Sequence, residues 1–386
     1  MLLQDFSPRT LPTGLLAAFV GFASSFAVIL AGLNAVGASP SQVASGLMIL
    51  SIAMGLGGIL LSLATRMPIS IVWSTPGAAL LAVSPKIAGG FPVAVGAFLM
   101  CAAMIVLCGI WRPLGRAVAS IPPALANAML AGIMLHLCLA PVNAVAALPV
   151  QGVTIIGVWA LIAKFKRLFA VPAAVLVAAV LIVWDLHAPQ FGNLAPQLEF
   201  VWPQFTLTAL IGVALPLFVV TMASQNIPGF AVLNINGFRP EPGPLFTATG
   251  ILSALAAPFG GIALNLAAVT AALCAGEEAH AEPSKRYWTA IVAGAAYVVF
   301  GLFAGAITAF VSVAPPLLIE SVAGLALLGA FSSSMLAALN HAESREAAAL
   351  TFLVTASSLS FFGIGGAFWG LIAGGLMLGL RKWRTV

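Results

Sequence analysis

Apolar runs alternate along the chain with short connections that are polar or rich in proline and glycine. Most of these runs have the length that a helix needs to cross a bilayer. The pattern predicts an all-α polytopic membrane protein with fourteen transmembrane segments, near residues 14–34, 41–63, 69–84, 91–111, 121–140, 150–163, 169–185, 206–225, 244–258, 260–275, 287–309, 315–337, 347–362 and 366–380.

The longest polar connection, from His187 to Gln204, divides these segments into two groups of seven. An odd number of spans in each group places the two halves in opposite orientations across the membrane. This is the inverted-repeat plan of many secondary transporters.

The third run is too short for a plain helix. Pro68 and Pro85 enclose sixteen residues, and at a rise of about 1.5 Å each a helix would cover only roughly 24 Å of a hydrocarbon core about 30 Å thick. The β-branched residues that follow Pro68 favour an extended segment, which gains about 3.3 Å per residue. We therefore predict an extended segment up to Thr75 and a half-helix from Gly77, with Pro76 at or beside its start.

A half-helix that begins inside the membrane leaves its first N–H groups without intrahelical partners and carries partial positive charge there. An anion site is the functional interpretation, and a proline-kinked helix without a ligand is the alternative. The tenth run repeats the pattern, because the stretch from Pro258 to Thr270 is short and opens with proline and glycine. We predict that spans 3 and 10 are each half strand and half helix, with the two half-helices meeting at the midplane.

The first span of each half carries neutral polar side chains that could hold a carboxylate. Ser24 and Ser25 interrupt an apolar run, while Ser224, Gln225 and Asn226 close the eighth span before a Pro-Gly pair. The alternatives are that the two serines join neighbouring helices by hydrogen bonds, and that Gln225 and Asn226 cap a helix C-terminus.

Composition and charge support the membrane assignment. The sequence is 62% hydrophobic and 6% charged, with a mean hydropathy of +1.13, whereas soluble domains are about 25% charged. With the N-terminus inside, fourteen of the fifteen Lys and Arg residues fall on the cytoplasmic side and only Lys86 falls outside, which is the positive-inside pattern. The net charge of +5 therefore reflects topology rather than nucleic-acid binding, and both termini are predicted to be cytoplasmic.

Six stretches carry a resemblance to a known family: residues 21–25 (GFASS), 73–80 (WSTPGAAL), 128–133 (AMLAGI), 215–226 (LPLFVVTMASQN), 278–280 (EAH) and 367–375 (AFWGLIAGG). Together they resemble the benzoate:proton symporter family of bacterial inner membranes, the BenE type. That family is similar to the nucleobase/ascorbate and sulfate permeases, which implies inverted repeats divided into a core and a gate domain. On this basis residues 1–118 and 205–310 are expected to form the core, and residues 119–190 and 311–386 the gate.

The wider resemblance implies that substrate is held by the third and tenth spans and by the eighth. With the two serines of the first span, the candidate substrate-binding residues are Ser24, Ser25, Thr75, Pro76, Gly77, Ala78, Ala79, Leu80, Ser224, Gln225, Asn226, Gly261, Ile262, Ala263 and Asn265. The nucleobase permeases typically carry acidic residues at the eighth and tenth spans, whereas this chain has Ser224-Gln225 and Ile262. A carboxylate there would repel an anion, so the departure favours an anionic substrate over uracil.

The resemblance implies a secondary transporter for proton-coupled uptake of benzoate or a similar aromatic carboxylate, and is compatible with a homodimer. An uncoupled anion exchanger or channel and a nucleobase-type permease are the alternatives. His136 in the fifth span and Glu320 near the outer end of the twelfth are proton-coupling candidates, because ionisable groups inside membranes are functional by default. Benzoic acid could also bind with its own proton, which needs no relay.

An intramembrane enzyme is disfavoured, because the four histidines form no HExxH motif and no paired acids lie in the spans. No GxxxxGK[ST] loop is present, which argues against ATP-driven transport by this chain alone. No cofactor or metal is expected. The acidic patch at residues 277–282 resembles a metal site, but Lys285 and Arg286 in the same loop favour a solvated role or an ion pair between helices.

Overall fold

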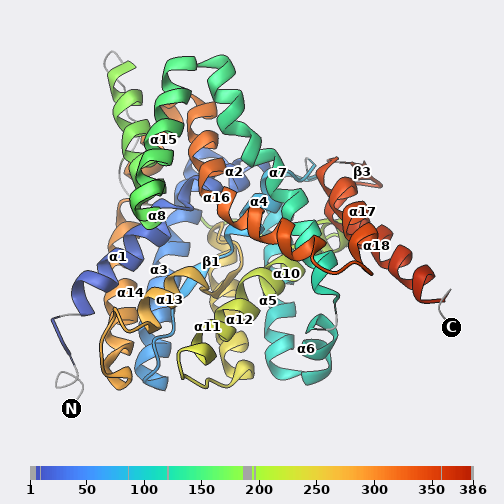
Figure 1. Ribbon diagram of the computed structural model, residues 1–386, viewed down its shortest axis with the longest axis horizontal. Coiled ribbons are helices and arrows are strands. Elements are labelled where there is room, and N and C mark those ends of the chain that lie inside the picture. The colour runs from blue at the N-terminus through green and yellow to red at the C-terminus, as the bar shows by residue number, and fades with distance from the viewer. Residues whose placement is uncertain are drawn as a thin grey trace.

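The computed structural model describes residues 6–8, 10–85, 87–119, 121–185, 194, 197–357 and 359–383. Within these residues the chain is a bundle of helices with two short two-stranded sheets (Figure 1). Arg9, Lys86 and Arg384, which the charge argument counted, lie outside the described residues.

The first half of the chain contains eight helices and one strand among its described residues. They are α1 (Thr10–Ala23), α2 (Phe26–Ala35), α3 (Pro40–Thr65), β1 (Ile71–Trp73), α4 (Thr75–Ala82), α5 (Phe91–Ile110), α6 (Arg112–Ala119), α7 (Pro123–Ala147) and α8 (Pro149–Asp185).

The second half is more fragmented. Its described elements are α9 (Leu207–Ala209), η2 (Leu210–Ala214), α10 (Leu215–Thr221), η3 (Met222–Asn226), α11 (Ile227–Ile235), α12 (Pro242–Ala256), η4 (Ala257–Phe259), β2 (Leu264–Leu266), α13 (Val269–Ala275), η5 (Pro283–Lys285), α14 (Tyr287–Leu302), α15 (Ala304–Val313), α16 (Pro316–Leu339), α17 (Arg345–Ala356), β3 (Ser360–Phe361), β4 (Ile364–Gly365) and α18 (Gly366–Trp383).

Seven helical stretches among the described residues are long and apolar enough to cross a membrane. An eighth is reached if the stretches Pro283–Leu302 and Ala304–Val313, bent by 55° where they meet, form one span. The chain is therefore a mostly helical, polytopic membrane protein. The count of fourteen spans and the inverted repeat stay predictions.

Two of the predicted spans share the long helix α8. The backbone of Lys166 is not helical there (φ −146°, ψ 91°), so two helices meet at this residue. The break falls in the predicted connection between residues 163 and 169, where three basic side chains interrupt the apolar pattern.

At the centre of the fold, the two interrupted crossings pair with each other. Strands β1 and β2 are antiparallel, with Val72 opposite Asn265 and Trp73 opposite Leu264. Each strand is followed by a short helix, α4 or α13, so the prediction of an extended segment and then a helix is confirmed for both crossings. In Figure 1 the strand β1 lies between α4 and α13.

The predicted end of the eighth span is wrong. The helix does not stop at Gln225 but continues through η3 and α11 to Ile235. The two π-helical turns η2 and η3 end directly before Leu215-Pro216 and Ile227-Pro228. Each turn shifts the backbone bonding to i−5, as in the bond from Ile227 N–H to the Met222 carbonyl, and such turns accommodate residues that lack an N–H.

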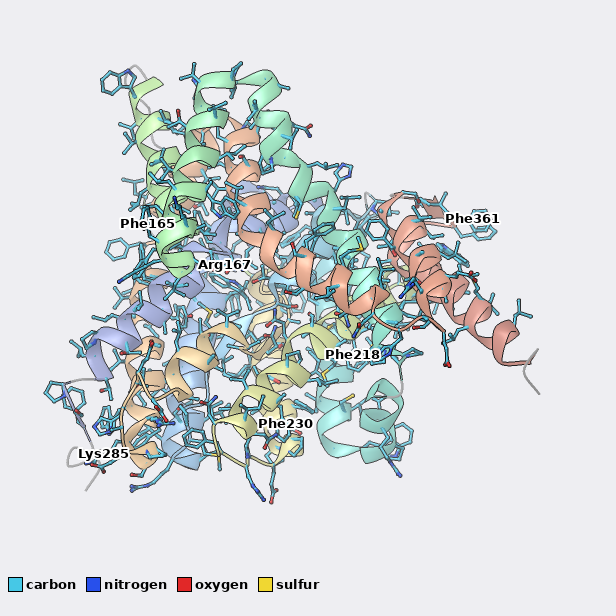
Figure 2. The ribbon with its side chains drawn as sticks, in the orientation of Figure 1. Phe165, Arg167, Phe218, Phe230, Lys285 and Phe361 are labelled. Atoms are coloured by element: carbon cyan, nitrogen blue, oxygen red, sulfur yellow. The ribbon has the colours of Figure 1, made fainter. Side chains whose placement is uncertain are left out.

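Two other boundaries differ from the prediction. The thirteenth run was expected to be helical to residue 362, but α17 ends at Ala356 and residues 360–365 form the β3–β4 hairpin, whose Phe361 is labelled in Figure 2. The positively charged connection after the fourth run contains the additional short helix α6.

The long helices pack in two groups. In one, α14 packs against α1 and α3, and α12 packs against α5; in the other, α7 packs against α16 and α17, and α17 against α18. In Figure 1 the second group lies above and to the right of the first, and α8 lies at the upper left. The strands and half-helices lie where the two groups meet, because α4 contacts α7 of the second group and also α2, which packs against α3 of the first.

Candidate functional site

The half-helices α4 and α13 begin at opposite ends of the β1–β2 ribbon. At one end Ser74 N–H donates to the Ala263 carbonyl at 2.9 Å, and at the other Ala267 N–H donates to the Ser70 carbonyl at 2.9 Å. Because the strands are antiparallel, each helix points its N-terminus at the ribbon from the opposite side. Two partially positive helix ends therefore face the same short stretch of backbone.

The first turn of α4 is partly satisfied by its own residues. The Ser74 hydroxyl accepts a hydrogen bond from Gly77 N–H at 3.2 Å, the Ser74 carbonyl accepts from Ala78 N–H at 2.8 Å, and Pro76 has no N–H. Thr75 is half-buried, and its N–H makes no backbone hydrogen bond to the described residues. This helix end therefore offers one open backbone donor, fewer than the sequence analysis expected.

The N-terminus of α13 is less satisfied. No described side chain caps it, and its first intrahelical bond runs from Ala272 N–H to the Ala268 carbonyl at 3.3 Å. The side chain of Val269 is 67% exposed at this end. The Thr270 hydroxyl is buried and lies 2.9 Å from the hydroxyl of Ser70 at the start of the opposite crossing.

Hydroxyl pairs connect the ribbon to its neighbours. Ser74 Oγ lies 2.8 Å from Thr221 Oγ1 of α10, and Trp73 Nε1 donates to Ser25 Oγ at 2.8 Å. All four residues are buried. The sequence analysis did not assign Ser74 or Thr221 to the site. A serine before a Pro-Gly pair has the character of an N-cap, and Thr221 precedes Ser224 and Gln225 by one helical turn, so both carried a recognisable signal.

Asn226 and Asn265 lie at the ribbon itself and are fully buried. Asn226 Oδ1 accepts a hydrogen bond from Leu266 N–H at 2.9 Å. The side chain therefore satisfies a backbone donor of β2 and does not cap a helix C-terminus. In the amide orientation that satisfies both of its ends, Asn265 donates to the Leu266 carbonyl at 2.9 Å and accepts from Ser74 N–H at 3.1 Å. Both carboxamides therefore stabilise the ribbon.

The two neighbours of Asn226 are half-buried. Ser224 Oγ donates to the Val220 carbonyl at 2.6 Å within its own helix, and Gln225 lies in the π-helical turn η3. In the first span, Ser25 Oγ donates to the Gly21 carbonyl at 2.7 Å and Ser24 Oγ reaches the same carbonyl at 3.4 Å. These serines stand at the break between α1 and α2.

The remaining candidates present backbone rather than side chains. Ala78, Ala79 and Leu80 are buried in α4, and Gly261, Ile262 and Ala263 are buried in the extended segment before β2. Helix α2 approaches α4 so closely that a Cβ at Gly32 would lie 2.5 Å from the Ala78 carbonyl oxygen. Such an approach leaves no room for a larger residue at position 32 and fixes α4 against α2.

Aromatic rings gather on one side of the ribbon. The ring centroid of Phe22 lies 5.4 Å from that of Trp73, 5.7 Å from that of Phe26 and 5.1 Å from that of Phe300. Phe218 is buried on α10 (Figure 2).

The charged and titratable candidates lie away from the ribbon. The helices and strands that form it, β1, α4, η3, β2 and α13, contain no Asp, Glu, Lys, Arg or His. His136 on α7 and Glu320 on α16 are exposed. The crossing is therefore surrounded by neutral hydrogen-bonding groups.

The loop after α13 contains two basic residues with different contacts, and the sequence analysis did not predict the role of the second, Arg286. Lys285 pairs with Glu282 at 2.9 Å, three residues away in the same loop. Arg286 is 5% exposed and donates from Nη1 to the Ala275 carbonyl at 2.7 Å and from Nε to the His280 carbonyl at 2.8 Å. It therefore caps the C-terminal end of α13 and complements the helix dipole.

The sequence is similar to those of known membrane proteins. The family model for BenE, benzoate membrane transport protein, matches residues 4–380. The chain is 40% identical over 386 residues to the inner membrane protein YdcO of Escherichia coli (strain K12), covering 97% of this chain and 96% of the relative. It is 32% identical over 375 residues to the benzoate membrane transport protein of Acinetobacter baylyi, covering 96% and 94%.

Solved structures show a related fold. The transmembrane domain of the cyanobacterial bicarbonate transporter BicA aligns with a TM-score of 0.63 and 15% identity, over 96% of this chain and 98% of that one. The murine anion transporter Slc26a9, in its inward-facing state, aligns with a TM-score of 0.68 and 11% identity, over 98% and 69%. At these identities the similarity concerns the fold alone.

Proposed function

This chain belongs to the BenE family of benzoate membrane transport proteins, and from that premise we propose that it takes up benzoate or a similar aromatic carboxylate together with protons. It would act as a secondary active transporter in a bacterial inner membrane. The positive-inside pattern supports a topology with both termini in the cytoplasm.

The observation that carries the proposal is the pairing of two half-helices across one ribbon of neutral residues. A carboxylate bound at the start of α4 would meet the Thr75 N–H, and the uncapped first turn of α13 lies at the other end of the same ribbon. Helix N-termini stabilise anions, and no acidic side chain occurs in the elements that form the ribbon to oppose one. The candidate residues of the first, third, eighth and tenth spans would surround this position.

The aromatic ring of the substrate would pack on the rings beside Trp73. Phe22, Phe26 and Phe300 form a continuous apolar wall next to the ribbon. A site with an apolar wall and a few fixed polar groups is typical of small-molecule binding. This combination favours an aromatic carboxylate over a small inorganic anion.

Transport would proceed by movement of a core against a gate. We assign residues 1–118 and 205–310 to the core and residues 119–190 and 311–386 to the gate, in two inverted repeats of seven spans. The antiparallel ribbon, with one strand from each half of the chain, supports this assignment. The core would carry the substrate and α7 and α16 would provide the opposing surface.

Three groups could carry the proton: His136, Glu320 and the carboxyl group of the substrate itself. The two side chains are exposed on α7 and α16, two helices that we assign to the gate. Transport that keeps its proton coupling after both are replaced would favour the substrate as carrier.

An uncoupled anion exchanger or channel is the second candidate function, because the fold is similar to that of the Slc26a9 anion transporter. A nucleobase-type permease is less well supported, since Gln225 and Ile262 replace the acidic residues expected there.

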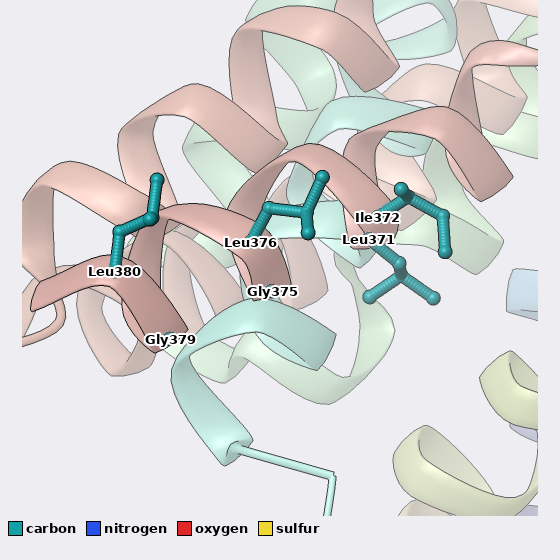
Figure 3. A pocket seen from close by; sticks show the side chains of 6 residues that line it. All are labelled: Leu371, Ile372, Gly375, Leu376, Gly379 and Leu380. Atoms are coloured by element: carbon teal, nitrogen blue, oxygen red, sulfur yellow. The ribbon is translucent and has the colours of Figure 1, made fainter. Parts of the chain in front are cut away.

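A homodimer would place two copies side by side in the membrane. The outer face of α18 carries an open apolar groove of about 530 Å³ (Figure 3), lined by Leu371, Ile372, Gly375, Leu376, Gly379 and Leu380. A GxxxG pair in an apolar helix permits close helix contact, so cross-linking through cysteines introduced on this face would test the dimer.

The test of the function is uptake of radiolabelled benzoate into proteoliposomes. An imposed inward proton gradient should drive accumulation above the equilibrium level, and excess unlabelled benzoate should compete while uracil and sulfate should not. Accumulation that never exceeds equilibrium would support the uncoupled alternative, and competition by uracil would support the nucleobase permease.

A further inference from the structure

The β3–β4 hairpin joins α17 to α18 and lies at the upper right of Figure 1. Its strands are antiparallel, with Phe361 opposite Ile364. Both residues of the connecting turn, Phe362 and Gly363, have positive φ (54° and 74°), which is the conformation of the tight turns that fit the twist of a hairpin. The connection between α17 and α18 is therefore a formed structural element.

The helix that follows the hairpin holds it in place. The indole N–H of Trp369 on α18 is shared between the carbonyl oxygens of Phe361, at 3.3 Å, and Ile364, at 3.2 Å, so that it binds both strands. The rings of Trp369 and Phe361 also meet edge to face, with centroids 5.6 Å apart. The hairpin is therefore expected to move together with α18, which we assign to the gate.

The hairpin also lies against two elements that we assign to the core. A Cβ at Gly212 in η2 would lie 3.3 Å from the Gly363 carbonyl oxygen, and a Cβ at Gly363 would lie 3.2 Å from Cγ2 of Thr208 in α9. A Cβ at Gly365 would lie 3.3 Å from Cδ of Pro85, which follows α4. The hairpin thus contacts both the eighth span and the end of the third crossing.

The predicted topology places these contacts on one side of the membrane. With the N-terminus inside, the connections after the third, seventh and thirteenth spans all fall outside. Pro85 begins the first of these connections, Thr208 lies at the start of the span that follows the second, and the hairpin contains the third. Three segments that the charge pattern assigns to the outer side are therefore neighbours in the structure.

The hairpin is held more firmly by the gate than by the core. Among the residues that the structure describes, no hydrogen bond or ion pair joins it to Thr208, Gly212 or Pro85. Glycine backbone makes these contacts, while the side chains of Phe361 and Phe362 remain 52% and 79% exposed. Because hydrophobic stabilisation scales with the apolar area buried, the hairpin can leave the core at a small cost in free energy.

The contact at Pro85 bears on access to the proposed site. Helix α4 begins at Thr75 and ends at Ala82, three residues before Pro85. A ligand that comes from the outer side must pass the length of α4, about 12 Å, to reach the open N–H of Thr75. The hairpin adjoins the outer end of this path.

We propose that the β3–β4 hairpin is an outer latch. It moves with the gate, rests on the outer ends of the third and eighth spans in this structure, and leaves them when the site opens to the outside. The latch rests on the core and gate assignment of the proposed function, and it adds the residues at which the two parts separate.

A reversible cross-link tests the latch. In Pro85→Cys with Gly365→Cys, the two thiols face each other across the core contact, and oxidation should abolish benzoate uptake into proteoliposomes until a reductant restores it. Ser360→Cys with Gly365→Cys is the matched control. Ser360 and Gly365 are directly opposite within the hairpin, so this disulfide leaves the hairpin free of the core and should leave uptake unchanged. Wild-type protein oxidised in parallel controls for the four native cysteines.

The two possible failures can be told apart. Uptake that persists in fully cross-linked Pro85→Cys with Gly365→Cys would overturn the latch, and so would two reactive thiols that do not form a disulfide. Absence of benzoate uptake in the wild-type protein would instead contradict the proposed function. The latch would then be decided by a distance measurement that needs no substrate.

That measurement places spin labels on Phe362→Cys and Trp202→Cys, two positions that are each 79% exposed. Trp202 belongs to a segment that is bound to the core, since Val201 N–H donates to the Pro258 carbonyl at 2.7 Å. In liposomes we expect two populated distances between the labels, one for the latch on the core and a longer one for the latch released. A single distance that neither benzoate nor pH changes would overturn the proposal, also where Pro85→Cys fails to fold.

Discussion

Trp73 Nε1 donates a hydrogen bond to Ser25 Oγ at 2.8 Å, and this bond joins strand β1 to the break between α1 and α2. Trp73 is 1% exposed and Ser25 is 6% exposed. This buried hydrogen bond joins the first span to the ribbon at the point where its helix is interrupted, beside the Phe22–Trp73 ring contact.

Ser25→Ala should destabilise the protein by about 1–3 kcal/mol, because it leaves the buried indole N–H without its acceptor. Thermal unfolding of the purified protein measures this loss. Ser24→Ala is the control, since the Ser24 hydroxyl reaches only its own helix at 3.4 Å, and should change stability little. Equal effects of the two substitutions would show that the Trp73 bond is unimportant.

Ser74→Ala and Thr221→Val should have different consequences, although the two hydroxyls contact each other. Ser74→Ala removes both the pair and the N-cap of α4, which costs about 1 kcal/mol for the cap alone. Thr221→Val removes the pair but keeps the cap. We expect Ser74→Ala to raise the KM for benzoate uptake more than Thr221→Val does. The opposite order would show that the N-terminus of α4 is not part of the binding site.

Gln225→Glu should reduce benzoate uptake at least about tenfold, because a new negative charge beside the ribbon would repel the carboxylate, and each 1.4 kcal/mol of lost binding is tenfold. Gln225→Ala removes the same amide without adding charge and should be milder. Initial uptake rates at several benzoate concentrations distinguish an effect on KM from one on kcat. If both variants transport like the wild type, the eighth-span residue does not face the substrate.

Arg286→Gln and Lys285→Gln test the cap of α13 with two adjacent basic residues. The buried side chain of Arg286 donates hydrogen bonds to two carbonyl oxygens. Its replacement should therefore lower the free energy of unfolding by about 2 kcal/mol. Lys285 forms a partly exposed pair with Glu282, which is worth about 0–1 kcal/mol. Chemical or thermal unfolding should therefore rank Arg286→Gln clearly below Lys285→Gln in stability, and similar values would contradict the assigned capping role.

The strand-and-helix form of the third crossing could be predicted because it rests on a length constraint. Two prolines end the helical pattern on both sides, and the residues between them are too few to span as a helix. The tenth crossing has the same form. Its helix begins at Val269, whereas Pro258 and the glycines that open the run precede the strand.

The end of the eighth span could not be predicted in the same way. Pro228 follows a polar Ser-Gln-Asn stretch, which resembles a helix end, yet the helix passes through. The helix continues past Pro228, which has no N–H to donate, because the π-helical turn η3 shifts the backbone hydrogen bonds just before it. The side chain of Asn226 accepts its hydrogen bond from β2. That partner lies forty residues away, so only the tertiary fold reveals it.

The partners of the buried hydroxyl groups at the site could not be predicted either. Ser70 with Thr270 and Ser74 with Thr221 are separated by 200 and 147 residues. Sequence patterns place such residues on elements but do not identify their partners. The predicted backbone candidates of α4, in contrast, do lie at the crossing, because the helix start was fixed by local signals.

The central claim is that an aromatic carboxylate binds at the start of α4, and alkylation of a cysteine placed there tests it most directly. In Thr75→Cys, with the wild-type protein measured in parallel for labelling of its native thiols, the rate of maleimide modification is followed with and without ligand. We predict that benzoate slows modification with a concentration dependence that matches its KM for uptake, and that uracil does not. An unchanged rate at saturating benzoate, in a variant that still transports benzoate, would contradict the account.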